Sequence, residues 1–352
     1  MKRVILILGF LIILSCQEEN KKKGLEHIES VEVQTIYEDS VSIRTLEILN
    51  DGSLAFAGSD GKFGLYSPAD KKWVTNTISE DSLKPSFRAT GHTSTDFFML
   101  SVANPALLFK TGDNGQMQPV YYEEGEKVFY DSLKFWNDRE GIAMGDPTGN
   151  CLSIIITRDG GNTWNKINCD ELPPSEAGEA AFAASNTNIN ISGNKAWIIT
   201  GGMKSRVFYT PDKGKKWEVF ETPLIQGTPT QGGYSMDFYD KMEGFIVGGD
   251  YTNPDLNTGN KARTEDGGRT WELVSDGAEP GYKSCVQYIP TMGGKELITV
   301  GFTGISYSAD RGDTWRTLSD EGFYTLRFIN DSTAYAAGKN RISKLMFKRG
   351  EQ

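Results

Sequence analysis

The stretch Thr157-Arg158-Asp159-Gly160-Gly161-Asn162-Thr163-Trp164 follows the pattern Thr-x-Asp-x-Gly-x-x-Trp, and the chain repeats this pattern. The other full copies begin with Thr or Ser and place their Asp and Trp at Asp212 and Trp217, Asp266 and Trp271, and Asp310 and Trp315. A fifth copy around Asp113 keeps the turn but has Gln118 in place of Trp. Successive Asp residues are 46, 53, 54 and 44 residues apart. Internal repetition at this period indicates a propeller or another repeat array.

Each part of the octet suits a tight hairpin. The Asp side chain accepts backbone N–H groups, and the Gly adopts a positive φ without steric cost. The Trp that follows offers a large apolar surface for packing. The octet resembles the Asp-box, or BNR, repeat. We therefore expect these residues to hold hairpins together and to contact no ligand.

The chain divides into seven units that begin with a polar residue and a short strand. The first residues of these strands are Arg44, Arg88, Asp131, Glu179, Tyr234, Ser284 and Tyr324. A short apolar strand follows in most units, and two further strands flank the Asp-box. Four short strands per unit are typical of a propeller blade. The sequence predicts an all-β, seven-bladed β-propeller.

The last unit ends near Phe347 and lacks a fourth strand. The alternating segment 31–37 precedes the first unit and has no other partner. We expect this N-terminal strand to close the ring as the outer strand of the last blade. The propeller then spans residues 31–347, with residues 348–352 as a tail.

The N-terminus is basic at Lys2 and Arg3, and an apolar run follows up to Ser15. This pattern indicates an export signal over residues 1–15. Ile13-Leu14-Ser15-Cys16 resembles a bacterial lipobox, which implies lipid attachment at Cys16 and a polar tether over residues 16–30. The alternative is an ordinary secretory signal. Gln17 favours the outer membrane over the inner one, and either face of that membrane is compatible with the sequence.

Loss of Lys2 and Arg3 changes the formal net charge from −10 to −12. An acidic chain is a poor binder of nucleic acid. Of the four cysteines, Cys151 and Cys169 flank the first full Asp-box at equal distance from Gly160. They form either a cross-strand disulfide, as an oxidising compartment permits, or two buried thiols. Cys285 is expected in the core.

In a propeller the first strands surround a central channel, and their leading residues open on one face. The candidates for a binding site at this mouth are Arg44, Arg88, Asp131, Asp146, Glu179, Tyr234, Asp250, Lys283 and Tyr324. Two adjacent arginines suit a carboxylate or a phosphate. The alternative is that the arginines neutralise Asp131 and Glu179 in a satisfied polar channel.

The segments Phe135-Trp136-Asn137-Asp138 and Gly178-Glu179-Ala180-Ala181-Phe182 resemble BNR propellers related to the photosystem II stability and assembly factor. The similarity is greatest to a branch from non-photosynthetic bacteria that often carries the label "oxidoreductase". The resemblance implies the fold and a protein partner. Together these features predict a lipid-anchored, monomeric binding or assembly module.

Two enzyme classes are the alternatives. A sialidase-like hydrolase would use Arg44 and Arg88 on a substrate carboxylate and Tyr234 or Tyr324 as nucleophile, but a third ring arginine is missing. An oxidoreductase would need a cofactor site, and the chain has neither a G-x-G-x-x-G fingerprint nor Cys-x-x-Cys. Only two histidines are present. We therefore expect no cofactor and no metal.

The expected role of the N-terminal strand is testable by deletion. Removal of residues 31–40 should cost far more stability than removal of residues 17–30, because only the former are expected to pair within a blade. Thermal melting of the two deletion variants measures the difference. Equal melting temperatures would contradict the closure.

Overall fold

The structure is a computed structural model that describes residues 27–79, 83–112 and 115–350. These residues form β-strands that are connected by turns and loops, and one short 3-10 helix, η2 (Cys169–Glu171). No helix within the described ranges is long and apolar enough to cross a membrane. The expected all-β class is confirmed. Cys16 and Asp113 lie outside the described residues.

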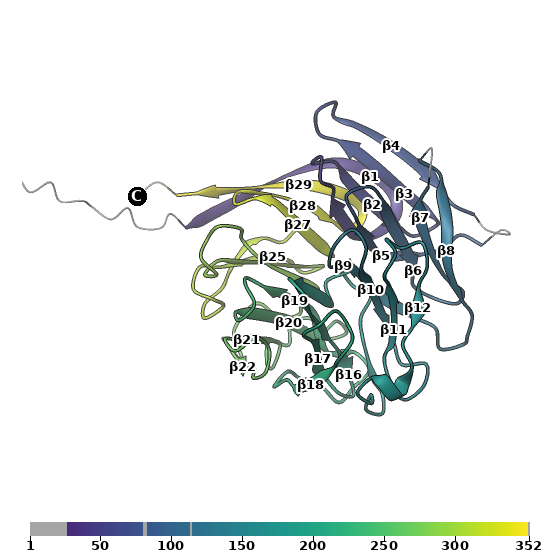
Figure 1. Cartoon of the computed structure of the whole chain (residues 1–352). Helices are drawn as coiled ribbons and strands as arrows, with labels where there is room; N and C mark the ends of the chain where they lie inside the picture. Colours follow the sequence, from purple (N-terminus) through teal and green to yellow (C-terminus); the bar gives the residue numbers. More distant parts are fainter. Residues whose placement is uncertain (1–26, 80–82, 113–114, 351–352) are drawn as a thin grey trace, which may run out of the picture.

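The strands form small antiparallel sheets (Figure 1). Four sheets have four strands each. The first contains β5 (Phe87–His92), β6 (Phe97–Ser101), β7 (Ala106–Thr111) and β8 (Met117–Glu123), and the second contains β9 (Tyr130–Phe135), β10 (Gly141–Gly145), β11 (Ser153–Thr157) and β12 (Asn165–Lys166). The third contains β14 (Ile189–Ser192), β15 (Lys195–Ile199), β17 (Arg206–Thr210) and β18 (Glu218–Glu221), and the fourth contains β23 (Cys285–Tyr288), β24 (Leu297–Gly301), β25 (Gly304–Ser308) and β26 (Arg316–Ser319). A further sheet contains β13 (Glu179–Ala180), β16 (Gly201–Gly202), β19 (Gln231–Phe238), β20 (Gly244–Asp250), β21 (Lys261–Thr264) and β22 (Glu272–Leu273).

The remaining sheet joins the two ends of the described chain. Its strands, in spatial order, are β27 (Thr325–Asn330), β28 (Thr333–Ala337), β29 (Lys339–Arg349), β1 (Ile28–Ile48), β2 (Leu54–Gly58), β3 (Lys62–Ser67) and β4 (Lys72–Thr77). Residues 28–42 of β1 pair with β29, and residues 43–48 pair with β2. In Figure 1 the purple β1 accordingly runs beside the yellow β29. One strand therefore serves the first and the last repeat unit.

The first strands of the units contact one another in cyclic order. The order is β1, β5, β9, β14, β19, β23, β27 and back to β1. The second strands β2, β6, β10 and β24 are buried along their whole length, and they contribute side chains to the apolar clusters of the core. This packing places the inner strands around a common axis.

The expected inner strand of the fourth unit, at Glu179–Phe182, is wrong. The inner strand there is β14, and Glu179 instead lies in β13, which pairs with β16. Residues 181–188, here called the channel segment, precede β14 and are mostly buried. Thr325 Oγ1 donates to Ser185 O (2.9 Å), and Asn186 Nδ2 donates to Thr90 O (2.8 Å). The segment thus fills the space between opposite inner strands with small and polar residues.

The Asp-box makes the same hydrogen bonds in each full copy. Thr157 Oγ1 donates to Asp159 Oδ1 and accepts from the Gly161 N–H, both at 2.9 Å. Asp159 Oδ1 accepts the Thr163 N–H (3.0 Å), and Trp164 Nε1 donates to Gly161 O (3.2 Å). The equivalent bonds occur in the copies with Asp212 and Trp217, Asp266 and Trp271, and Asp310 and Trp315. The side chains of each octet therefore hydrogen-bond to the turn that the octet itself forms.

The box glycine also packs against the preceding sheet. A Cβ built on Gly161 would lie 2.2 Å from a ring carbon of Phe98 in β6. The pairs Gly214 with Ile156, Gly268 with Trp197, and Gly312 with Phe245 repeat this contact around the molecule. The glycine is required twice, for its positive φ and for the close approach of the preceding sheet.

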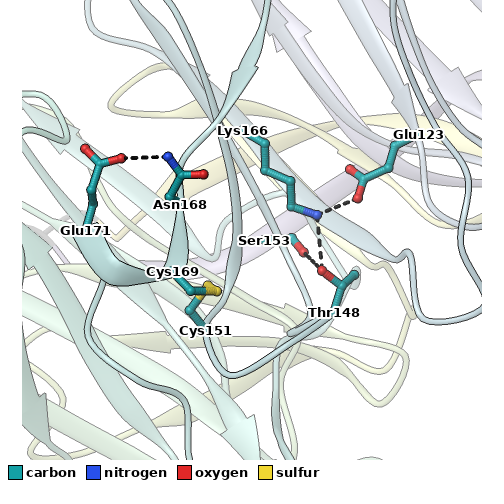
Figure 2. Close-up of a disulfide and its surroundings, with 8 residues drawn as sticks. All are labelled: Glu123, Thr148, Cys151, Ser153, Lys166, Asn168, Cys169 and Glu171. Atoms are coloured by element: carbon teal, nitrogen blue, oxygen red, sulfur yellow. Dashed lines mark hydrogen bonds and ion pairs between the residues drawn. A yellow bond between two sulfur atoms is a disulfide. The ribbon is translucent and has the colours of Figure 1, made fainter.

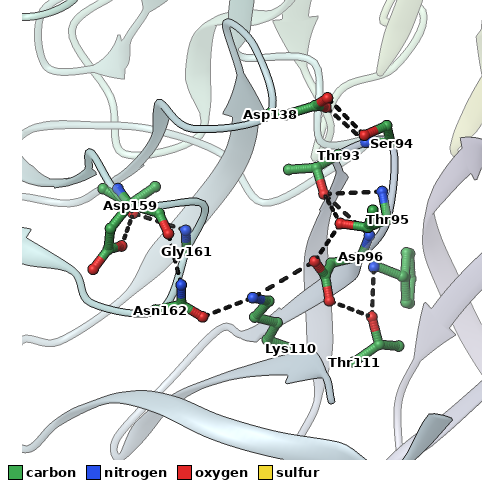
Figure 3. A network of polar contacts seen from close by, with 12 residues as sticks. Thr93, Ser94, Thr95, Asp96, Lys110, Thr111, Asp138, Asp159, Gly161 and Asn162 are labelled. Atoms are coloured by element: carbon green, nitrogen blue, oxygen red, sulfur yellow. Dashed lines mark hydrogen bonds and ion pairs between the residues drawn. The ribbon is translucent and has the colours of Figure 1, made fainter. Parts of the chain in front are cut away.

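Figure 3 shows how polar contacts join the first full Asp-box to the neighbouring sheet. Lys110 Nζ donates to Asn162 Oδ1 (2.8 Å) and forms an ion pair with Asp96 (3.5 Å). On the same side, Ser94 donates from its backbone N–H to Asp138 Oδ1 (2.7 Å). These contacts link β7 and the β5–β6 turn to the following unit.

A disulfide joins Cys151 to Cys169, with 5.4 Å between their Cα atoms (Figure 2). It links the loop between β10 and β11 to η2. Lys166 lies beside it and forms an ion pair with Glu123 of the preceding sheet. Cys285 is a buried free thiol in the core.

The double role of the box glycine leads to a prediction. Gly161→Ala should destabilise by about 3 kcal/mol, because a left-handed residue with a side chain is strained and the Cβ collides with Phe98. Gly277→Ala is the matched control: its φ of 74° is close to the 77° of Gly161, but nothing lies within 4 Å of the added atom. It should cost only about 1 kcal/mol. Equal losses in urea denaturation would contradict the inter-sheet contact.

Candidate functional site

Four of the inner strands carry a β-bulge at the same position, and the extra residue is a polar or aromatic one. In β1 the register shifts between Ile43 and Thr45, which leaves Arg44 unpaired. The same shift leaves Arg88 unpaired in β5, Asp131 in β9 and Tyr234 in β19. A bulge re-aims the side chain of its extra residue. The predicted ring residues are thus the bulged ones.

The remaining inner strands place other residues at the corresponding position. The Tyr324 N–H donates to Ala337 O (2.7 Å), although Ala337 pairs with Thr325. The Ser284 N–H donates to Val300 O (3.0 Å), which belongs to the partner of Cys285. In the fourth unit the Ile199 N–H donates to Asn188 O and Ile189 pairs with Ile198, so Asn188 continues the ladder of β14 and is not an extra residue. The sequence missed the channel segment, because no octet or apolar strand marks it.

Arg44 and Arg88 lie close together without a carboxylate partner. The Arg44 guanidinium stacks over the Tyr324 ring, with its carbon 4.0 Å from the ring centroid. Within the described part of the chain, neither arginine has a carboxylate oxygen within 4.0 Å. Burial and the charge of Arg44 lower the pKa of Arg88, and the charges of Asp131 and Tyr324 oppose this. The mouth therefore holds two mutually repelling cations.

Asp131 and Asp146 form an acidic pair next to these arginines. Asp131 is fully buried (0% exposed), and neither carboxylate oxygen has a hydrogen-bond partner among the described residues. Burial raises the pKa of Asp131 and the charge of Asp146 raises it further, whereas the charge of Arg88 opposes this. Burial raises the pKa of Asp146 to about 6, although its Oδ1 accepts the Ala181 N–H (2.7 Å).

The opposite side of the mouth is aromatic. The rings of Tyr234 and Phe182 stack at 3.8 Å, and Tyr282 meets Tyr234 edge-on at 4.8 Å. Tyr251 and Phe302 adjoin these rings and are 47% and 45% exposed. Burial raises the pKa of Tyr234 above its ordinary range. Tyr234 is therefore held as a neutral packing residue.

Three predicted site residues are occupied elsewhere. Glu179 forms a buried ion pair with Arg206 (2.5 Å) and accepts from Thr200 Oγ1 (2.6 Å). Lys283 donates to Thr303 Oγ1 (3.2 Å) and Gly304 O (2.9 Å), and burial lowers its pKa to about 8. Asp250 accepts from the Thr252 hydroxyl (2.6 Å) at the edge of the aromatic side. Glu179 and Lys283 thus hold loops in place.

The channel segment forms the floor under the mouth. Asn186 Oδ1 accepts the Leu133 N–H (2.9 Å), and its Nδ2 reaches Glu47 Oε1 (3.3 Å). Beyond this floor, Glu47 contacts His92 (3.1 Å) and Lys134 (2.9 Å). Nearby charges, chiefly that of Lys134, outweigh burial and lower the pKa of Glu47 to about 2. This satisfied network belongs to the far side of the channel.

Chemically, the mouth offers a binding surface for an anion beside aromatic rings. Two half-buried guanidinium groups suit a carboxylate or a phosphate. In the ranges that the structure describes, no group of three Asp, Glu, His or Cys residues is placed to hold a metal ion.

The raised pKa of Asp146 predicts a pH-dependent stability. Below pH 4 the Asp146 carboxyl is protonated in the folded and the unfolded state and does not change the free energy of unfolding. Above pH 6 the carboxylate is ionised although it is buried, which destabilises the folded state. The shift of about 2 units corresponds to about 3 kcal/mol. Asp146→Asn should therefore raise the melting temperature at pH 7.5 and have little effect at pH 4. Asn retains an acceptor for the Ala181 N–H.

Asp266→Asn is the control of opposite sign. Burial alone would raise the pKa of Asp266, but hydrogen bonds from Thr270 and Thr264 lower it. The ionised Asp266 carboxylate therefore stabilises the folded state above the pKa that Asp266 has in the unfolded chain, and this stabilisation is lost as the pH falls. This variant should melt lower at pH 7.5. If Asp146→Asn also melts lower there, the proposed burial cost is wrong.

Comparison with known proteins places the fold among the propellers. No protein-family model and no curated protein matches the sequence. The solved structure titled "YCF48 bound to D1 peptide" is 15% identical with a TM-score of 0.65, over 91% of this chain and 96% of that one. A streptogramin B lyase gives 13% and 0.64 over 91% and 98%, and the RRP9 WD40 repeats give 10% and 0.65 over 92% and 100%. These likenesses show that the chain has a β-propeller fold.

Proposed function

We propose that the protein is a binding or assembly module whose channel mouth holds an anionic group of a protein partner. The observation that carries this proposal is the pair Arg44 and Arg88. Both side chains are placed by bulges on adjacent inner strands, and neither has a carboxylate partner within the described residues. Two neighbouring cations at partly buried positions without an ion-pair partner are costly unless an anion binds them.

A protein partner fits the rest of the mouth. Exposed Tyr251 and Phe302 beside an arginine pair have the composition of interface hot spots, which are rich in Tyr and Arg. YCF48, a propeller of similar fold, has been solved with a bound peptide. A short acidic peptide or a chain terminus would present its carboxylate to the arginines and its apolar side chains to the aromatic side.

The proposed architecture is a ring of seven blades closed by the N-terminal strand. The cyclic order of seven inner strands and the pairing of β1 with both β29 and β2 support it. We also propose that the monomeric propeller is tethered through lipidated Cys16 to the outer membrane. This part rests on the lipobox-like sequence Ile13-Leu14-Ser15-Cys16 and the polar residues after it.

The arginine pair predicts a loss of anion binding. The full chain would be titrated with short peptides that end in a free carboxylate and with the same peptides carrying a C-terminal amide. The double variant Arg44→Ala/Arg88→Ala should weaken binding of the carboxylate form by at least about 100-fold, as expected for charge-assisted hydrogen bonds of about 1.5–3 kcal/mol each. Binding of the amide form should be weak in both proteins.

Arg139→Ala is the matched control, because Arg139 is exposed and lies on a turn away from the mouth. It should leave affinity unchanged. Equal affinity for the carboxylate and amide forms, or no effect of the double variant, would contradict the anion site. Cross-linking in the native membrane would then be the way to find a partner that binds elsewhere.

A further inference from the structure

A groove opens between the first two units of the ring. It has a volume of about 980 Å³, and its lining comes from β2, β3 and β4 on one side and from β6, β7 and β8 on the other. Leu65 of β3 and Val74 of β4 form a cross-strand pair in the wall of this groove and are 42% and 72% exposed. An apolar face of the first unit is thus open to solvent at a junction between two units.

At two other junctions an aromatic ring of one unit contacts the octet Trp of the following unit. Phe98 of β6 meets Trp164 edge-on, with 6.4 Å between the ring centroids. Phe245 of β20 lies 5.8 Å from Trp315. The second-strand ring and the octet indole together fill the space between the two sheets there.

Ala55 is the residue of the first unit that corresponds to Phe98 and Phe245. Each of the three pairs with the inner-strand residue three places after the unpaired residue of its unit. The following octet has Gln118 in place of Trp, and Gln118 is exposed. Phe97 of the second unit lines the groove but leaves it open. Both aromatic partners are therefore missing at this junction, and the groove takes their place.

The glycine of the second octet gives an independent observation. A Cβ built on Gly115 has nothing among the described residues within 4 Å, whereas a Cβ built on its counterpart Gly161 lies 2.2 Å from Phe98. The second octet therefore stands away from the preceding sheet, and the other full octets touch theirs. The repeat itself thus defines what fits the open space, which is an indole.

The full octets also show which charge accompanies the indole. Lys213 and Arg311 each lie four residues before the Trp of their octet. Lys213 forms an ion pair with Glu140, and Arg311 forms one with Glu243 (3.2 Å). Each of these carboxylates directly precedes the second strand of the preceding unit. A basic residue near the Trp therefore meets a carboxylate of the neighbouring sheet.

The first unit offers a carboxylate at the corresponding end of β2. Asp51 accepts the N–H of Ser53, the residue directly before β2, at 2.8 Å, and Asp51 is exposed. Asp51 and Asp96 are the charged residues of the groove lining, and Lys110 forms an ion pair with Asp96. Asp51 thus complements a positive charge on whatever enters the groove.

We propose that the groove binds a tryptophan side chain of a protein partner, with a lysine or arginine of the same partner segment placed at Asp51. The partner would supply the packing that the second octet lacks. Exposed apolar patches next to a polar rim are typical of protein interaction sites. This surface goes beyond the proposed anion site and does not rest on it, because none of its residues belongs to the mouth.

The test uses the capped peptide acetyl-Lys-Gly-Lys-Lys-Trp-amide, which has the sequence of residues 213–217. In calorimetric titration of the full chain, replacement of the peptide's Trp by Ala should weaken binding at least about tenfold, as for an aromatic anchor in a pocket. Replacement of its first Lys by Gln should weaken binding about threefold, as for an exposed ion pair. The peptide has no carboxylate, so failure of the anion site leaves this result interpretable.

Variants of the chain locate the binding site. Leu65→Ser should weaken binding of the peptide about fivefold, because an apolar contact is lost. Ile329→Ser is the matched control, since Ile329 is also 42% exposed but lies outside the groove, and it should leave affinity unchanged. Asp51→Asn should remove the difference between the Lys and Gln peptides, and Asn retains an acceptor for the Ser53 N–H.

Gln118→Trp restores the octet. Its own indole should enter the groove, weaken binding of the peptide at least about tenfold and raise the melting temperature of the chain. A folded variant that loses binding because the groove is filled separates occupation of the site from unfolding.

Four outcomes would overturn the proposal. Two are equal affinity for the Trp and Ala peptides, and unchanged affinity in both Leu65→Ser and Gln118→Trp. The third is binding of N-acetyltryptophanamide as tight as that of the peptide, which would make a small aromatic molecule the ligand. The fourth is a dimer in sedimentation that Leu65→Ser dissociates, which would make a second copy of the chain the occupant.

Discussion

Strand β1 is the constraint on which the ring depends, because it hydrogen-bonds to strands from both ends of the chain. Residues 28–42 pair with β29, and residues 43–48 pair with β2. Without this strand, two sheets would expose unpaired edges, which are prone to association with other chains. The same strand carries Arg44 at its change of partner. One segment thus joins the two ends of the described chain and positions Arg44.

The bulges turn a repeating scaffold into a site with varied chemistry. On β1, β5, β9 and β19 one residue has no partner in the ladder, so its side chain is free of any pairing role, and Tyr324 lies directly before β27. The chain fills these positions with Arg44 and Arg88 on one side, Asp131 on the next strand, and Tyr234 and Tyr324 around the rest. The Asp-boxes and the apolar second strands stabilise the sheets, and the bulged positions belong to neither.

The sequence predicted the fold and much of the mouth, for a physical reason. Octets such as that at Asp159 encode local turns, and each apolar second strand fixes the register of the strand before it. The missed elements depend on distant contacts. Glu179 follows the same local pattern as the true first strands, but Arg206 holds it in another sheet. The channel segment owes its position to contacts of Ser185 and Asn186 with opposite strands, which no local pattern reports.

The channel segment fills the centre of the ring, so the mouth is a closed recess and not a pore. It bonds to strands on opposite sides: Ser185 O accepts from Thr325 Oγ1, and the Asn186 side chain donates to Thr90 O and accepts the Leu133 N–H. The segment lies between the arginine side and the Glu47 network and bonds to the latter through Asn186 Nδ2. A ligand in the mouth would contact residues that hydrogen-bond to several blades. Ligand binding would therefore stabilise the whole ring.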